Sequence, residues 1–134
     1  MSPSWLVIGL GNPGPRYDGT RHNVGADVIT ELCRRVGENL SPARGQRAEL
    51  VRTRLSSAGL GIPAADAQTV TLMRSRTYMN ESGIAVRKVA DFSGITPDHL
   101  IVVHDEIDLD PGRLRIKKGG GDNGHNGLKS IRAH

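Results

Sequence analysis

Short apolar runs alternate with amphipathic segments along this chain, and that alternation limits its possible folds more than any other feature. The run Trp5–Ile8 precedes Gly9, as is typical of a buried strand. Apolar residues then recur at helical spacing between residues 21 and 36. A second apolar run, Leu100–Val103, predicts another buried strand. Strands joined by helices indicate an α/β fold, with a mixed, largely parallel β-sheet flanked by helices.

The same criteria predict the rest of the secondary structure. Further strands are predicted over residues 48–55, 69–73 and 113–117, a second helix over 80–92 and the start of a third over 128–133. Residues 38–46 are predicted to form a loop, and residues 59–68 an exposed connection. Because the chain stops at His134, in the first turns of the last predicted helix, we expect the domain to have further C-terminal elements.

The two complete helices have predicted ends and apolar faces. Thr20 is predicted to cap the first helix and Gly37 to end it. The apolar stripe of this helix includes Val24 and Val28, and Cys33 lies on it as a buried structural thiol. Asn80 is the expected N-cap of the second helix. The residues expected to share one apolar side of the second helix are Ile84, Val89 and Phe92.

Length and composition favour one domain, residues 1–134, outside membranes. No apolar run approaches the roughly 20 residues needed to cross a bilayer, and we see no signal peptide before Trp5. The single cysteine excludes an internal disulfide and a cysteine-rich zinc site, which favours a reducing, cytoplasmic compartment. The net charge of +4 is suited to a partner that carries phosphates, although codon bias in a GC-rich genome would also enrich Arg.

The glycine-rich segment Gly9–Gly14 has two interpretations. Its spacing matches the G-x-G-x-x-G pattern of dinucleotide-binding folds, in which a helix N-terminus approaches a pyrophosphate. Here Pro13, Pro15 and Gly19 delay the helix, and no convincing acidic residue ends a second strand. A structural turn that positions Asn12 is therefore favoured over the site of a nucleotide-dependent oxidoreductase.

Three further segments carry side chains capable of chemistry. His22 lies at the predicted start of the long helix, where the helix dipole favours a neutral imidazole that can act as a general base, although a lone His at a helix start is more often only a capping or solvated residue. The segment His104–Asp108 follows a strand, and its carboxylates could orient an imidazole, bind a metal or form a solvated turn. The glycine loop at residues 119–127 could hold an anion at the following helix or be a mobile surface loop.

In their order along the chain, these segments resemble the peptidyl-tRNA hydrolase family of bacteria. The resemblance covers residues 6–131, and the order of the motifs makes it specific. The matching motifs are Leu6–Gly14, Tyr17–Gly25, Thr77–Gly83, His104–Asp108 and Gly119–Ile131. The resemblance implies an α/β fold and an ester hydrolase that uses neither a metal nor a cofactor.

The resemblance also implies a role for each residue of the predicted site. His22 is the expected base that activates the attacking water, and Asp105 is the expected partner that orients or polarises it. The residues expected to contact the peptidyl end and the water are Asn12, Asn80 and Asn126. Met79 is expected to line the peptide groove, and Tyr17 to lie beside the 3′ end of the tRNA. The residues expected near the tRNA backbone are Arg115, Lys117 and Lys118.

The implied reaction is hydrolysis of the ester between the peptide and the 3′-ribose of peptidyl-tRNA, which recycles the tRNA. Asn side chains would donate hydrogen bonds to the oxyanion that develops, and an ester is already activated towards water. Peptidyl-tRNA is the expected partner, and the chain is expected to act as a cytoplasmic monomer. The alternative is a truncated, catalytically impaired relative that binds tRNA, and replacing His22 with Ala would separate the two hypotheses.

Overall fold

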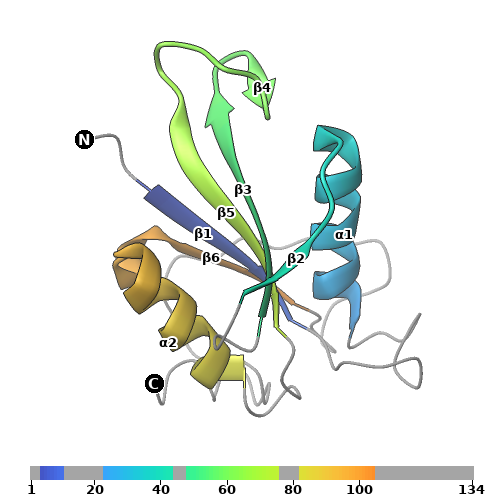
Figure 1. Ribbon diagram of the computed structural model, residues 1–134, viewed down its shortest axis with the longest axis vertical. Helices are drawn as coiled ribbons and strands as arrows, with labels where there is room; N and C mark the ends of the chain where they lie inside the picture. The colour runs from blue at the N-terminus through green and yellow to red at the C-terminus, as the bar shows by residue number, and fades with distance from the viewer. Residues whose placement is uncertain (1–3, 11–22, 44–47, 76–81, 105–134) are drawn as a thin grey trace.

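A mixed six-stranded sheet with a helix on each face forms the frame of the computed structural model, which describes residues 4–10, 23–43, 48–75 and 82–104 (Figure 1). The helices are α1 (Val24–Val36) and α2 (Ser82–Ser93), and a 3₁₀ turn follows at Pro97–His99. The strands are β1 (Ser4–Gly9), β2 (Ser41–Ala43), β3 (Ala48–Ser56), β4 (Gly59–Leu60), β5 (Gln68–Ser75) and β6 (Leu100–Val103). This arrangement confirms the predicted α/β class.

Strand β1 lies between β5 and β6 in the described sheet, whose order is β2-β3-β5-β1-β6 with β4 paired to β3. It pairs in parallel with both β5 and β6, so Gly9 lies level with Arg74 on one side and Val103 on the other. The pairs β3–β5, β2–β3 and β3–β4 are antiparallel. The carboxyl ends of three parallel strands therefore meet at one edge of the sheet.

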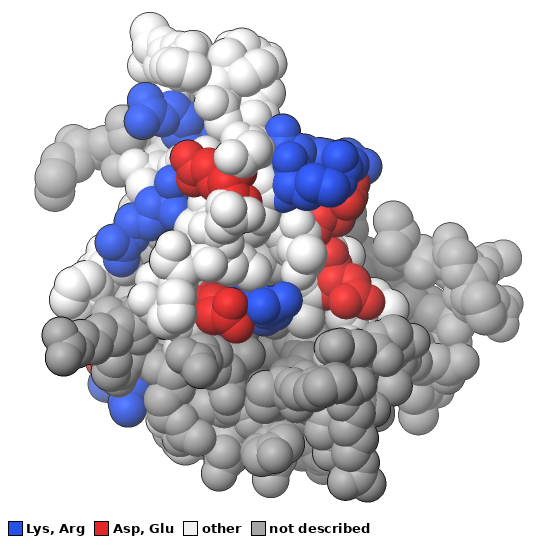
Figure 2. Space-filling model, turned by 45° about the vertical axis from the view of Figure 1, so that its right-hand side comes forward, with Lys and Arg blue, Asp and Glu red and all other residues white. Residues whose placement is uncertain are grey.

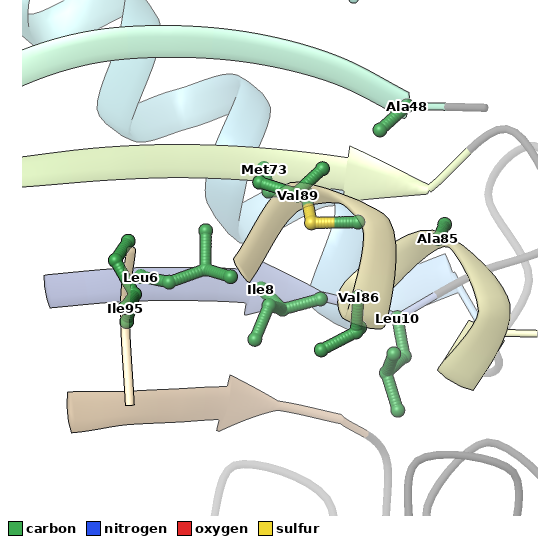
Figure 3. Packing of buried hydrophobic residues seen from close by; sticks show 9 residues of the cluster. All are labelled: Leu6, Ile8, Leu10, Ala48, Met73, Ala85, Val86, Val89 and Ile95. Atoms are coloured by element: carbon green, nitrogen blue, oxygen red, sulfur yellow. The ribbon is translucent and has the colours of Figure 1, made fainter. Parts of the chain in front are cut away.

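Alternation along β1 divides the core into two layers. Leu6 and Ile8 are fully buried on the side of α2, where they pack with Met73 of β5. Figure 3 shows Val86 and Val89 of α2 directed onto this layer. The burial of both faces explains why the start of β1 reads as an unbroken apolar run.

The second layer lies between the sheet and α1. Ile29 and Cys33 of the helix pack on Val51, Val70 and Leu72 of the sheet. Cys33 is 4% exposed, which confirms the predicted buried thiol. The helix ends as predicted, because Gly37 adopts a left-handed conformation with φ of 74°.

The first turns of α1 differ from the prediction. The helix begins at Val24 with Asn23 at the N-cap position, so it starts later than residue 21. Thr20, the predicted cap, lies outside the described residues. Val24 and Val28 are 46% and 37% exposed, so these two members of the apolar stripe do not face the core. The buried side of the helix includes Ile29 and Cys33, which belong to the same predicted stripe.

Two other predicted faces are also wrong. Phe92 is 70% exposed although it was expected to share the apolar side of α2 with Val89, which is fully buried. Phe92 is in the last turn of the helix, where its ring lies 5.8 Å from the guanidinium of Arg52 on β3 rather than in the core. In β6, Ile101 is 48% exposed and the other three residues are half-buried, so this strand is not the fully buried one that its composition predicted.

Short strands appear in two segments that were predicted to be loops. Ser41–Ala43 pairs with the start of β3, and Gly59–Leu60 pairs with its end. Neither short strand has an apolar alternation of its own. Each is held by its hydrogen bonds to β3 rather than by a buried face, so its sequence carries no strand pattern. The positive φ of Gly59, 128°, allows the tight return at the tip of the hairpin.

Candidate active site

Three segments that are far apart in the sequence meet at the carboxyl edge of the sheet. The amide of Leu10, just after β1, donates a hydrogen bond of 3.0 Å to the carbonyl oxygen of Val103 at the end of β6. The carbonyl oxygen of Leu10 in turn accepts a bond of 3.1 Å from the amide of Ala26 in the first turn of α1. Leu10 therefore links the ends of two strands to the start of the long helix.

Two glycines allow this close junction. A Cβ atom on Gly25 would lie 2.1 Å from the carbonyl oxygen of Val103, and one on Gly9 would lie 2.1 Å from the carbonyl oxygen of Gly25. Real Cβ atoms essentially never come that close to other heavy atoms. The first glycine of the G-x-G-x-x-G segment thus serves the packing of strand against helix.

The N-cap residue of α1 is buried beside this junction. Asn23 is 5% exposed and has a φ of −102° and a ψ of 5°, and its side chain makes no hydrogen bond that caps the helix. The amides of the first helical turn give this end of α1 a partial positive charge. A charged or polar group placed just before Asn23 is therefore subject to the field of the helix.

Arg74 connects the same edge of the sheet to its neighbours. One guanidinium nitrogen donates a 3.2 Å bond to the hydroxyl of Thr30 on α1, and another donates bonds of 3.1 Å to both carboxylate oxygens of Glu49 on β3. This link could not be predicted from the sequence, because the three residues are distant in the chain and each lies in an ordinary surface pattern. It fixes β5, β3 and α1 relative to one another beside Gly9.

Each residue assigned to the predicted site lies outside the described residues. These are the expected catalytic pair His22 and Asp105, and the expected substrate and tRNA contacts Asn12, Tyr17, Met79, Asn80, Asn126, Arg115, Lys117 and Lys118. The described residues that flank them are Leu10, Asn23 and His104, and these belong to the junction or adjoin it.

The charges of the described residues cancel. They include seven Lys and Arg and seven Asp and Glu, and the space-filling view shows both signs interspersed on the face that it presents (Figure 2). The net charge of +4 therefore falls on the other segments, which carry eleven basic and seven acidic residues. Those segments contain all of the predicted site.

The described residues contain neither a metal-binding cluster nor a membrane-spanning helix. No group of three or more His, Cys, Asp or Glu in that part of the chain could hold a metal ion. Neither described helix is long and apolar enough to span a bilayer.

Comparison with known sequences gives a consistent result. The family model described as peptidyl-tRNA hydrolase matches residues 6–134. A peptidyl-tRNA hydrolase from Cutibacterium acnes is 92% identical over 134 residues, which are all of this chain and 67% of that protein. A second, from Pseudarthrobacter chlorophenolicus, is 47% identical over 131 residues, which are 98% of this chain and 62% of that protein.

Solved structures show the same likeness in three dimensions. The crystal structure of peptidyl-tRNA hydrolase from Acinetobacter baumannii superposes with a TM-score of 0.84 and 36% sequence identity. The superposition covers all of this chain and 63% of that one. The chain thus spans roughly two thirds of the length of the proteins that it resembles.

Proposed function

The chain belongs to the peptidyl-tRNA hydrolase family, and we propose that it hydrolyses the ester that joins a peptide to the 3′-ribose of tRNA. The observation that carries the proposal is the junction of Leu10, Gly25 and Val103, because the expected catalytic residues immediately follow or precede it. Family membership supplies the reaction, and the junction supplies a reason why distant residues could act together.

The short chain distances from the junction allow the expected catalytic groups to come within reach of one another. His22 is three residues from Gly25, and Asp105 is two residues from Val103, whose carbonyl oxygen packs on that glycine. An extended chain spans at most about 3.5 Å per residue, so neither backbone position can be farther than about 11 Å from its anchor. Asn12, two residues from Leu10, is held within about 7 Å by the same limit.

In the proposed reaction, His22 accepts a proton from a water molecule as the water oxygen attacks the ester carbonyl. Asp105 holds the imidazole in the required orientation and stabilises the positive charge that forms on it. Amides of Asn12, Asn80 and Asn126 hold the peptidyl end and the water. The C–O bond to the ribose then breaks, the proton passes to the 3′-oxygen, and the products are a free peptide acid and tRNA.

The start of α1 favours this role for His22. The helix begins at Val24, so His22 is next to the N-cap residue, Asn23, in the sequence. The positive end of the helix dipole disfavours a second positive charge nearby, and so favours the neutral imidazole that a general base requires.

The distribution of charge supports a phosphate-bearing substrate. The basic excess lies entirely in the segments that contain the predicted site, including Arg115, Lys117 and Lys118. Basic side chains next to a catalytic group would attract the acceptor end of tRNA and hold its backbone. We further propose that the chain acts as a monomer in the cytoplasm, where peptidyl-tRNA is produced.

The decisive experiment compares release of the blocked amino acid from N-acetyl-aminoacyl-tRNA by the wild-type chain and by His22→Ala. We expect the variant to lose turnover and to retain tRNA binding. His99→Ala is the matched control, because His99 directly precedes β6 and so lies at the end of that strand opposite to Val103. Its ring packs on that of Trp5, with the ring centroids 4.5 Å apart. Asp105→Asn should lower the rate while leaving the KM nearly unchanged.

Two outcomes would reject the proposal. If His22→Ala hydrolyses the ester as fast as the wild-type chain, another group is the base. If the folded wild-type chain binds tRNA without turnover, the tRNA-binding alternative is correct. Circular dichroism of each protein excludes unfolding as the cause in either case.

A further inference from the structure

The described basic residues fall into two groups according to their partners. Four of them are held by carboxylates: Arg34 and Arg35 by Glu31, Arg74 by Glu49, and Arg87 by Asp91. The other three, among the residues described, form no ion pair: Arg52, Arg54 and Lys88. All three are exposed, and they lie on two elements that contact each other.

Arg52 joins β3 to the end of α2. Its guanidinium donates a 3.0 Å hydrogen bond to the hydroxyl of Ser93 and lies 5.8 Å from the centre of the Phe92 ring. The ring is 70% exposed, so an arginine and an aromatic side chain are presented together to solvent. A cation over an aromatic face is fixed in direction while its remaining N–H donors stay available.

The other two cations extend this pair in both directions. Arg54 is two residues from Arg52, so both side chains leave the same face of β3, about 7 Å apart along the strand. Lys88 is four residues before Phe92 and therefore occupies the same side of α2, one turn nearer the start of the helix. Asp91, the carboxylate closest in sequence to Lys88, is engaged by Arg87.

From this arrangement we propose that Lys88, Arg52 and Arg54 form a contact surface, the α2–β3 surface, for the phosphodiester backbone of the tRNA substrate. The inference rests on the proposed function, since it extends the substrate contact beyond the ester. Unpaired, exposed cations in a row suit a polyanion with closely spaced phosphates, whereas cations already held by carboxylates do not. The exposed ring beside them is a feature that RNA-binding surfaces use for stacking.

The surface is placed to receive tRNA whose 3′ end is at the carboxyl edge of the sheet. Arg52 is level with Thr71 of β5 and, through it, with Leu6 of β1, three residues before Gly9. That corresponds to about 10 Å along the strand and two strand spacings of about 4.8 Å across the sheet. An acceptor stem is long enough to bridge this distance, so the same molecule could contact both places.

The test measures binding of deacylated tRNA by fluorescence anisotropy over a range of salt concentrations, which needs no turnover. In the triple variant Arg52→Gln, Arg54→Gln and Lys88→Gln we expect about tenfold weaker binding at low salt. The slope of log K against log salt should fall by about 0.9 for each lost contact with duplex phosphate, or about 2–3 in all. Lys88→Glu alone, which removes no internal hydrogen bond, should weaken binding in the same direction.

The matched control removes the same charge elsewhere. Arg34→Gln, Arg35→Gln and Arg87→Gln also lower the net charge by three, but all three of these residues are already paired. The inference is overturned if the control weakens binding as much as the test variant, or if the test variant leaves the affinity and the salt slope unchanged. It is also overturned if the wild-type chain binds no tRNA.

Hydrolysis assays separate this inference from the proposed function. With a short substrate, an N-acetylaminoacyl ester of a CCA trinucleotide, the triple variant should keep the wild-type rate, whereas its KM for full-length substrate should rise about tenfold. If the wild-type chain binds tRNA but hydrolyses neither substrate, the proposed function fails while the salt slopes still decide the inference.

Discussion

Gly25 packs against the carbonyl oxygen of Val103 so closely that a Cβ atom on Gly25 would be 2.1 Å from that oxygen. Neither Gly25 nor Val103 can move freely, because both are tied to Leu10. The carbonyl oxygen of Val103 accepts a hydrogen bond from the amide of Leu10, and the amide of Ala26, which follows Gly25, donates one to the carbonyl oxygen of Leu10. The contact is between backbone atoms, which cannot rotate away as a side chain would. It sets the distance between α1 and the end of β6.

Gly25→Ala should therefore destabilise the protein and also disturb the proposed site. Overpacking of this kind typically costs about 1–3 kcal/mol, and the added methyl must push α1 away from β6. We expect a lower midpoint in urea unfolding and a loss of hydrolysis greater than the loss of folded protein. Val24→Ala, at an exposed neighbouring position, should change the unfolding free energy by less than about 0.5 kcal/mol. Equal stability of the two variants would contradict the packing argument.

Cys33 should resist thiol reagents in the native protein. It is 4% exposed, and burial raises the pKa of its thiol, so little reactive thiolate is present at neutral pH. Reaction with Ellman's reagent should be slow in buffer. In denaturant the single thiol should promptly release one equivalent of thionitrobenzoate. Fast labelling of the folded chain would show that the layer between α1 and the sheet opens readily.

Glu31 should titrate well below an ordinary glutamate. Hydrogen bonds from Arg34, and then from Arg35, lower its pKa to about 2. A lowered native pKa adds stability above the unfolded value, about 4.5, and this contribution is lost as the pH falls towards 2. The contribution is small because all three side chains are exposed and screened by solvent.

An NMR titration of the Glu31 carboxyl carbon would measure this directly. Arg34→Ala should raise the Glu31 pKa towards its ordinary value, and Arg87→Ala, which removes an arginine from the other helix, should leave it unchanged. An unperturbed Glu31 titration in the wild-type protein would mean that the ion pairs of α1 do not persist in solution.

The sequence predicted the parts of the fold whose signals are local. The apolar run of β1, the helical spacing of α1 and its left-handed end at Gly37 all depend on residues close together in the chain. The faces of Val24 and Phe92 were predicted wrongly, because periodicity gives the direction of a helix face but not the width of the sheet beneath it. Strands β2 and β4 were missed because their partner, β3, is what makes them strands.

The candidate site was predicted from motifs rather than from geometry. His22, Asp105 and the three Asn residues were found because their neighbours in sequence match a family pattern. The pairing of Gly25 with Val103 could not be predicted, since nothing in either segment specifies the other. The structure adds that junction, and with it a physical reason for the glycine in the motif around His22.

The link between Arg74 and Glu49 should contribute measurably to stability, unlike the exposed ion pairs on the helices. Its side chains are 35% and 25% exposed, and the guanidinium contacts both carboxylate oxygens at 3.1 Å while also donating to Thr30. Glu49→Gln should lower the unfolding free energy by about 1–2 kcal/mol, because a half-buried charge then loses its partner. Glu31→Gln, at an exposed ion pair that solvent screens, should cost clearly less than Glu49→Gln.

A double-mutant cycle with Arg74→Met isolates the interaction itself. If the pair acts as the geometry indicates, the double variant should be less destabilised than the sum of the single variants, by about 1 kcal/mol. Urea unfolding of the four proteins at low and high salt gives the coupling, which should persist in part at high salt because the pair is shielded from solvent. Additive effects would mean that β3, β5 and α1 are held together by their apolar contacts alone.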